Sequence, residues 1–157
     1  MDQSLTEQIA RERGYNYLRE TLAALPPGVS LSYHPDNPVL GALGPENPVP
    51  CNDSNTVEHG PMNVTSGYWL VGVPAGQGRH YFDLITQLWS GWGWRESPGA
   101  DMKWAAFNNT DGYSLVIQDA GKGDGSLSLT TTSPCFPESA AGTTTPEPSV
   151  IEHPSGR

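Results

Sequence analysis

The amino-acid sequence predicts an α+β fold, in which two helices pack on one face of a mostly antiparallel sheet of about five strands. Three observations lead to this prediction. Two stretches carry apolar residues at helical spacing, and several shorter stretches carry the alternating or continuous apolar pattern of strands. The 18 glycines and 15 prolines among 157 residues supply the turns and irregular connections between them. A chain of this length forms one ordinary domain.

The first predicted helix begins near Ser4 and ends before Pro26. Ser4 and Glu7 have the spacing of a capping box, in which each side chain satisfies a backbone donor of the other residue. Proline ends the helix because it cannot continue the hydrogen-bond ladder. The apolar stripe of this helix consists of Leu5, Ile9, Leu18, Leu22 and Leu25.

Strands and a second helix follow. Residues 29–33 alternate apolar and polar side chains, and residues 67–73 form a near-continuous apolar run typical of a central strand. Between them, the proline-rich stretch 35–62 predicts a long irregular excursion. An apolar stripe predicts a second helix over 79–92. Further extended segments are expected at 94–96, 103–107, 113–117 and 126–130, with tight reversals at 111–112 and 121–125.

The two halves of the chain resemble each other weakly. A helix and a strand precede the segment 67–71 (GYWLV), and a helix and a strand also precede the segment 112–116 (GYSLV). This order fits an internal duplication of a helix-plus-hairpin unit. Chance recurrence of a Gly-Tyr step before a strand explains it about as well.

The chain divides into a folded domain, residues 1–137, and a tail, residues 138–157. In the tail, Val150 and Ile151 are the only aliphatic residues larger than alanine. Burial of so few apolar side chains cannot offset the conformational entropy that the chain would lose on ordering. We therefore expect a flexible Pro/Thr/Ser-rich tail. No stretch approaches the roughly 20 apolar residues of a membrane-spanning helix. The polar start of the chain predicts that it holds no signal peptide.

The charge balance excludes some classes of partner. Eight basic and 17 acidic residues give a formal charge of -9, and no run of lysine or arginine occurs. Nucleic acids and anionic lipid surfaces are bound by clustered basic side chains. We therefore expect no nucleic-acid partner and no electrostatic attachment to a membrane.

The two cysteines predict one disulfide. Cys51 and Cys135 lie at the margins of predicted strands and lack the C-x-x-C spacing of a redox pair. A Cys51–Cys135 bond would hold the proline-rich excursion to the end of the last strand. It would stabilise the fold by on the order of 4 to 5 kcal/mol, and it implies an oxidising compartment. The alternative is two separate reduced thiols in a cytosolic protein.

Three pairs of a histidine with a nearby carboxylate are candidates for a catalytic or metal site, but none has the spacing that such a site requires. A zinc or iron site needs three or more convergent ligands, and no such motif occurs. The chain also lacks the G-x-S-x-G pattern of a serine nucleophile. We therefore predict no metal, no cofactor and no catalytic residue. The histidine and carboxylate pairs considered are His34 with Asp36, Glu58 with His59, and His80 with Asp83.

Tryptophans form the best candidate for a ligand platform. The chain has five, and three of them fall within one short stretch. Such a cluster stacks on sugars or holds an acyl chain, although it more often fills the core between a helix and a sheet. The candidate platform consists of Trp89, Trp92, Trp94 and Trp104.

Four segments in sequence order carry a family resemblance: 22–28 (LAALPPG), 50–53 (PCND), 111–115 (DGYSL) and 129–136 (LTTTSPCF). Together they resemble the small cell-envelope lipoproteins of mycobacteria and their relatives, of the LppA and LppV type, over residues 15 to 137. The resemblance implies an export signal and a lipidated cysteine upstream of this chain, and Cys51 and Cys135 as a disulfide pair. It implies no catalytic residues, because this family is described as being of unknown function.

These observations predict a non-enzymatic, extracytoplasmic lipoprotein ectodomain that acts as a binding or envelope-interaction module. Its partner would be an envelope protein, a lipid or a glycan, and its membrane attachment would come only from the inferred upstream anchor. One alternative is a small envelope enzyme or carrier for lipid or glycan that uses the tryptophan platform. Another is an exclusion-type lipoprotein that blocks a partner at the cell surface.

Overall fold

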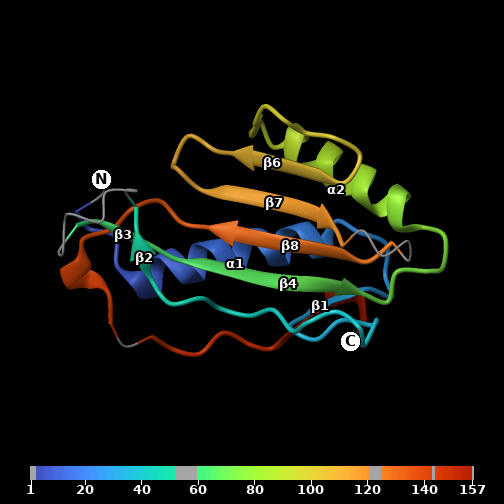
Figure 1. The fold of residues 1–157 in the computed structure, drawn as a ribbon, viewed down its shortest axis with the longest axis horizontal. Helices are drawn as coiled ribbons and strands as arrows, with labels where there is room; N and C mark the ends of the chain where they lie inside the picture. Colours follow the sequence, from blue (N-terminus) through green and yellow to red (C-terminus); the bar gives the residue numbers. More distant parts are fainter. Residues whose placement is uncertain (1–2, 52–59, 121–124, 143, 157) are drawn as a thin grey trace.

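A computed structural model describes residues 3–51, 60–120, 125–142 and 144–156 (Figure 1). The elements are α1 (Glu7–Ala23), β1 (Ser30–Ser32), β2 (Val49–Pro50), β3 (Met62–Asn63), β4 (Thr65–Val71), α2 (Gly78–Gly91), β5 (Arg95–Glu96), β6 (Trp104–Asn108), β7 (Ser114–Asp119), β8 (Leu127–Thr132), η1 (Glu138–Ala140), β9 (Val150–Glu152) and η2 (Pro154–Gly156).

One antiparallel sheet of seven strands dominates the fold. Its order is β5-β6-β7-β8-β4-β1-β9, and β2 with β3 forms a second, two-stranded sheet. The predicted α+β class with a mostly antiparallel sheet is confirmed. The sheet has more strands than the five or so predicted, because the C-terminal segment adds β9 at the edge beside β1.

Both helices pack on one face of this sheet, as predicted. Figure 1 shows α1 lying behind β8 and β4, with α2 further toward β6 and β7. The indole Nε1 of Trp89 in α2 donates to Thr21 Oγ1 in α1 at 3.0 Å, so the helices also contact each other. The main core lies between the helices and the sheet, and it includes fully buried Ile85, Leu115 and Leu129.

The strand register separates the two faces of the sheet. Tyr68 lies opposite Leu129 across β4 and β8, and these residues belong to the core on the helix side. Because side chains alternate along a strand, the neighbouring pair of Trp69 and Ser128 faces the other way. Each half of the chain contains a helix followed by antiparallel strands, and Tyr113 is buried in the same core as Tyr68.

The start of α1 differs from the prediction. The N-cap is Thr6, whose side chain accepts a hydrogen bond from the N–H of Ile9 at 3.2 Å. Glu7 is therefore the first residue of the helix and not the third, as the expected capping box requires, and its carboxylate has other partners. Its Oε2 pairs with Arg11 Nε at 2.9 Å, and its Oε1 accepts from the N–H of Gly142 at 3.0 Å.

The predicted reversals are found where the structure describes them. Gly112 and Gly125 have φ values of +92° and +74°, in the left-handed region that favours glycine. The remainder of the second reversal, residues 121–124, lies outside the described residues. Neither helix in the described ranges is both long and apolar enough to cross a membrane.

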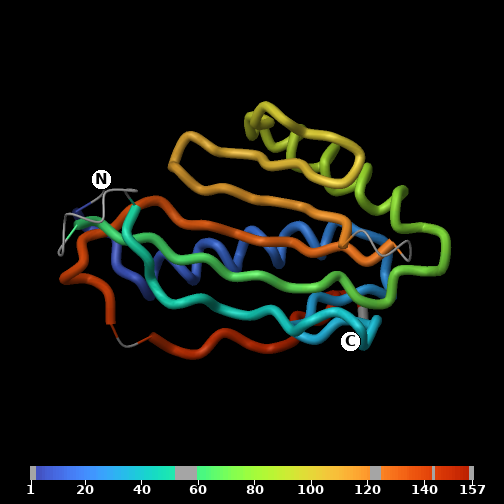
Figure 2. Tube along the Cα trace, in the orientation of Figure 1, coloured from blue at the N-terminus to red at the C-terminus, as the bar shows by residue number. Residues whose placement is uncertain are grey.

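The segment 138–157 was expected to be a flexible tail, and the structure corrects this. Residues 144–149, which we call the C-terminal strap, run along the edge of the molecule and lead into β9, which pairs with β1 (Figure 2). Polar contacts rather than apolar area hold the strap, which is why composition failed to predict it. These contacts are Thr145 N–H to Gln8 Oε1 at 2.6 Å, Tyr68 Oη to Pro148 C=O at 2.9 Å and Tyr33 N–H to Ser149 C=O at 2.9 Å.

Beyond the strap, two side chains fix the end of the chain. Ile151 in β9 is buried and belongs to the main core. His153 is also buried, and its Nε2 lies 2.7 Å from the carbonyl of Leu25. The Nδ1 of His153 accepts from the N–H of Ser155 at 3.1 Å, so Nε2 carries the proton and donates to Leu25.

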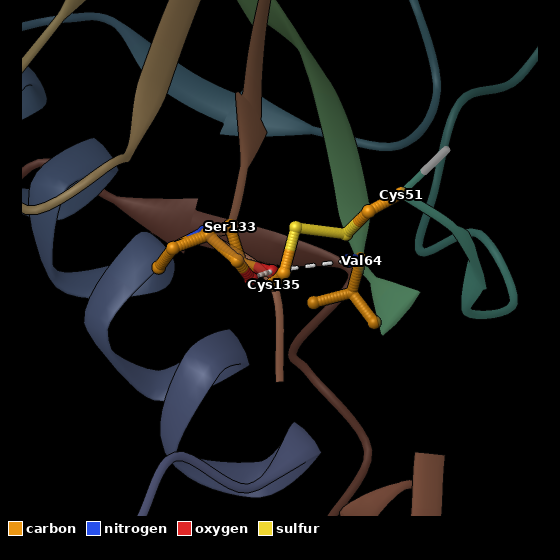
Figure 3. The surroundings of a disulfide bond; sticks show 5 residues. Cys51, Val64, Ser133 and Cys135 are labelled. Carbon is orange, nitrogen blue, oxygen red and sulfur yellow. Dashed lines mark hydrogen bonds between the residues drawn. A yellow bond between two sulfur atoms is a disulfide. The ribbon is translucent and has the colours of Figure 1, made fainter. Parts of the chain in front are cut away.

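The disulfide joins Cys51 to Cys135, as predicted, across a sequence separation of 84 and with a Cα–Cα distance of 6.2 Å. Figure 3 shows the disulfide beside Val64 and Ser133. These two residues are linked by a hydrogen bond from the N–H of Val64 to Ser133 Oγ, at 3.1 Å. A small second core lies at this end of the molecule. It consists of Leu5, Ala10, Val64 and Phe136.

Candidate binding surface

Three of the four predicted platform tryptophans lie on the helix side of the sheet. Trp89 is fully buried and meets the Phe107 ring edge-on, with centroids 5.7 Å apart. Trp94 is 9% exposed, and Trp92 is partly exposed with its ring centroid 6.1 Å from that of Trp94. These residues therefore act chiefly as packing between α2, α1 and the sheet.

The fourth tryptophan is on the opposite face. Trp104 lies opposite Gln118 in the register of β6 and β7, three positions before the core residue Phe107. An odd number of positions along a strand reverses the direction of the side chain. The structure thus brings Trp92 and Trp94 together and separates them from Trp104, so the four residues do not form one surface.

Tyrosines complete the aromatic cluster that the sequence only partly indicated. The ring centroid of Tyr17 lies 4.9 Å from that of Trp94 and 5.2 Å from that of Tyr113. Burial raises the pKa of both tyrosines, to about 12 for Tyr113. Tyr17 was missed because it flanks the apolar stripe of α1. Its partners come from other elements, so no local spacing signals the contact.

A groove lies between α1 and β9, the edge strand beside β1. It has a volume of about 700 Å³, within the usual range of ligand sites. Ile151 forms its floor, and exposed Val150 and Glu152 flank that residue along β9. We call this cavity the edge groove, and its α1 wall is formed by Tyr15, Asn16, Arg19, Glu20 and Ala23.

The edge groove combines apolar and charged groups. The guanidinium carbon of Arg19 lies 5.6 Å from the centroid of the Tyr15 ring. This is a cation–π contact between two residues of the α1 wall. Exposed Glu20 and Glu152 face solvent on the two sides of the groove. The rim of the groove therefore carries two carboxylates, Glu20 and Glu152, and one guanidinium, Arg19, around the apolar Ile151.

A buried polar cluster lies where the C-terminal strap runs beside α1. The side chains of Arg11 and Glu147 are 8% and 9% exposed, and Arg11 Nη1 lies 3.9 Å from Glu147 Oε1. Glu147 Oε1 accepts from Ser66 Oγ at 3.2 Å, and Arg11 Nη2 donates to the carbonyl of Glu46 at 2.7 Å. Within the described part of the chain, Arg11 Nη1 and Glu147 Oε2 have no hydrogen-bond partner.

Desolvation dominates the electrostatics of this cluster. Burial raises the pKa of Glu147, while the Ser66 hydroxyl and the Arg11 guanidinium act in the opposite direction. Burial also raises the pKa of the neighbouring Tyr33 and Tyr68, whose rings stack with centroids 4.7 Å apart. Cavities of about 660 and 180 Å³ lie on either side, and both are lined by Arg11 and Glu147.

The two carboxylates described from the predicted histidine and carboxylate pairs bind partners other than the histidines. Asp36 Oδ2 accepts from the N–H of Gly72 at 2.7 Å, and Asp83 pairs with Arg79 at 2.9 Å. Glu58 and His59 lie outside the described residues. In the part of the chain that the structure describes, no three histidine, cysteine or acidic side chains converge as metal ligands would.

Comparison with known proteins adds no relative. No protein-family model matches the chain, and neither a curated protein nor a solved structure matches it significantly. The resemblance to mycobacterial envelope lipoproteins therefore stays a prediction.

Proposed function

We propose that the protein is a non-enzymatic binding domain that works outside the cytoplasmic membrane, with the edge groove as its binding surface. Its partner belongs to the cell envelope, and an upstream lipid anchor of the kind implied by the resemblance would hold the domain there. The observation that carries the proposal is the groove between α1 and the side of β9 with which no strand of the described residues pairs.

The compartment is supported by the disulfide. Cys51 and Cys135 come from segments 84 residues apart and are joined in the fold. Disulfides of this kind persist in secreted and surface proteins and are rare in the reducing cytosol. This favours an extracytoplasmic location.

The tryptophans support a binding domain over a carrier of lipid or glycan. A carrier using the predicted platform needs its rings to line a ligand cavity. Trp89 and Trp94 are instead buried in the main core, and the edge groove contains neither of them. Their packing is that expected of a stable module.

Photocrosslinking in the native host tests the proposal. Benzoylphenylalanine replaces Asn16, an exposed residue of the groove wall. The matched control replaces Gln87, an exposed residue of the other helix. We expect a discrete crosslinked envelope component from position 16 and none from position 87.

Equal crosslinking from both positions, or none from position 16, would contradict the edge groove as the binding surface. Native mass spectrometry of the protein purified from the same cells tests the carrier alternative. A lipid or sugar bound in stoichiometric amount would support the carrier and overturn the binding-domain proposal.

A further inference from the structure

We propose that the edge groove binds an extended, basic segment of a partner protein, which pairs with the unpaired side of β9 as an additional strand. This inference rests on the proposed function and specifies the partner class of the same site. Strand addition to an exposed sheet edge is a general mode of peptide recognition, in which main-chain hydrogen bonds supply affinity and side-chain pockets supply specificity.

The hydrogen-bond register shows which backbone groups β9 offers. The N–H of Tyr33 donates to the carbonyl of Ser149 at 2.9 Å, and Leu31 lies opposite Ile151. Hydrogen-bonded and non-hydrogen-bonded pairs alternate in an antiparallel ladder, so Ile151 bonds to β1. The N–H and C=O groups of Val150 and Glu152 therefore point away from β1, where no strand of the described chain pairs with β9.

The helix beside this edge limits what can bind there. The wall of α1 runs along β9, and the groove between them is about 700 Å³ in volume. A single extended segment fits this geometry, because a strand needs a hydrogen-bonding edge on one side and side-chain contacts on the other. Tyr15 and Ala23 offer apolar contact area on the helix side, and Val150, whose side chain alternates with that of the core residue Ile151, offers it on the other face of the strand.

Charge favours a basic segment. The groove is lined by two carboxylates, Glu20 on α1 and Glu152 on β9, and by one guanidinium, Arg19, so its side chains carry an excess of one negative charge. The chain as a whole carries a charge of -9, which attracts a basic partner over long range. The same charge opposes pairing of β9 with β9 of a second copy, because each copy brings the same acidic surface.

A peptide titration followed by NMR tests the inference. The probe is a short acetylated and amidated peptide of alternating lysine and threonine, added to the isotope-labelled full chain with its disulfide intact. We expect chemical-shift changes centred on Val150, Ile151 and Glu152 and on the facing residues of α1. The amides of Val150 and Glu152 should become slower to exchange with solvent.

Two controls separate strand pairing from charge attraction. A peptide of the same composition with every backbone amide methylated keeps its charge but cannot donate to a strand. In the protein, Glu152→Lys reverses a charge on β9, and Glu96→Lys makes the same change on β5, the opposite edge of the sheet. We expect Glu152→Lys to weaken binding by about tenfold or more, and Glu96→Lys by about twofold at most.

Equal binding of the methylated peptide, or shifts spread over the acidic surface, would overturn strand addition. A dimer of the unliganded chain that dissociates on Glu152→Lys in sedimentation velocity would also overturn it and would identify a second copy as the occupant. If the titration fails while crosslinking from position 16 persists, the groove binds a partner by another mode. If neither the titration nor crosslinking from position 16 detects binding, the proposed function is wrong as well.

Discussion

At the scale of single residues, Gly14 shows how closely α1 approaches the sheet. A Cβ at this position would lie 3.0 Å from Thr131 Oγ1 and 3.1 Å from Thr131 Cγ2. Alanine is favoured over glycine in a helix by about 1 kcal/mol. Thr131 is buried on β8, so making room for the Cβ would disturb its packing, and we expect this cost to outweigh the gain.

We predict that Gly14→Ala lowers the free energy of unfolding by about 1 to 3 kcal/mol. Urea denaturation measures the loss, and the double variant Gly14→Ala/Thr131→Ala should recover it relative to Thr131→Ala alone. Gly91→Ala is the control, since a Cβ at Gly91 meets nothing within 4 Å. If Gly14→Ala were as well tolerated as Gly91→Ala, the close packing of α1 on β8 would be wrong.

Glu147 gives the fold a predictable dependence on pH. Burial raises its folded-state pKa above the ordinary value of 4.5. The groups around it are Arg11 of α1, Ser66 and Tyr68 of β4, and Tyr33 after β1. A raised folded-state pKa gives stability that is fully present below pH 4.5 and is lost as the pH rises through the folded value.

We therefore predict that Glu147→Gln becomes more stable relative to the native protein as the pH rises from 4.5 toward neutrality. Glutamine keeps a hydrogen-bonding group at this site but has no charge to bury. Urea denaturation of both proteins across this range measures the difference. Glu96→Gln, at an exposed position on β5, should show no such trend. A difference that stays constant or shrinks with rising pH would contradict the prediction.

At the scale of elements, β9 is the part of the fold that composition could not predict. Its only buried side chain, Ile151, fills a place in the main core beside Leu31. We predict that Ile151→Ala lowers the free energy of unfolding by about 2 to 4 kcal/mol. Val150→Ala, at the exposed neighbouring position, should change it by about 0.5 kcal/mol at most. Similar small effects for both variants in thermal and urea unfolding would show that the C-terminal segment is not part of the fold.

The spacing of apolar residues along the sequence correctly predicted the helices and strands that are held in place by burial of those residues. The stripe of α2 and the continuous run of β4 each gave an element close to its observed bounds. The C-terminal strap carries no such period, because its order comes from single polar contacts with distant residues, such as Glu147 with Ser66. The cap of α1 was misplaced for a related reason, since Glu7 binds Gly142 from the far end of the chain.

The candidate site was even less visible in the sequence. The tryptophan cluster was a reasonable choice because aromatic density marks both cores and ligand sites. Only the strand register places Trp104 on the opposite face from Trp94 and Phe107. The edge groove depends on β9 and α1, which lie at opposite ends of the chain, so its residues share no sequence motif.

At the scale of the whole molecule, the disulfide connects the two-stranded sheet to the end of β8. Closing a loop of 84 residues restricts the unfolded chain and stabilises the fold by on the order of 4 to 5 kcal/mol. We predict a loss of this size for the double variant Cys51→Ser/Cys135→Ser, measured by urea denaturation. Adding a reductant should destabilise the native protein similarly and leave the double variant unchanged. An effect of reductant on both proteins would assign the loss to something other than the bond.

We propose that this protein is a binding domain of an oxidising, extracytoplasmic compartment. The oxidation state of its two cysteines in the native host tests this proposal directly. Cells would be quenched in acid, and the protein would be alkylated without reduction and weighed by mass spectrometry. We predict that Cys51 and Cys135 are both unmodified, because they are bonded to each other. Two alkylated cysteines would contradict it and would place the protein in a reducing compartment.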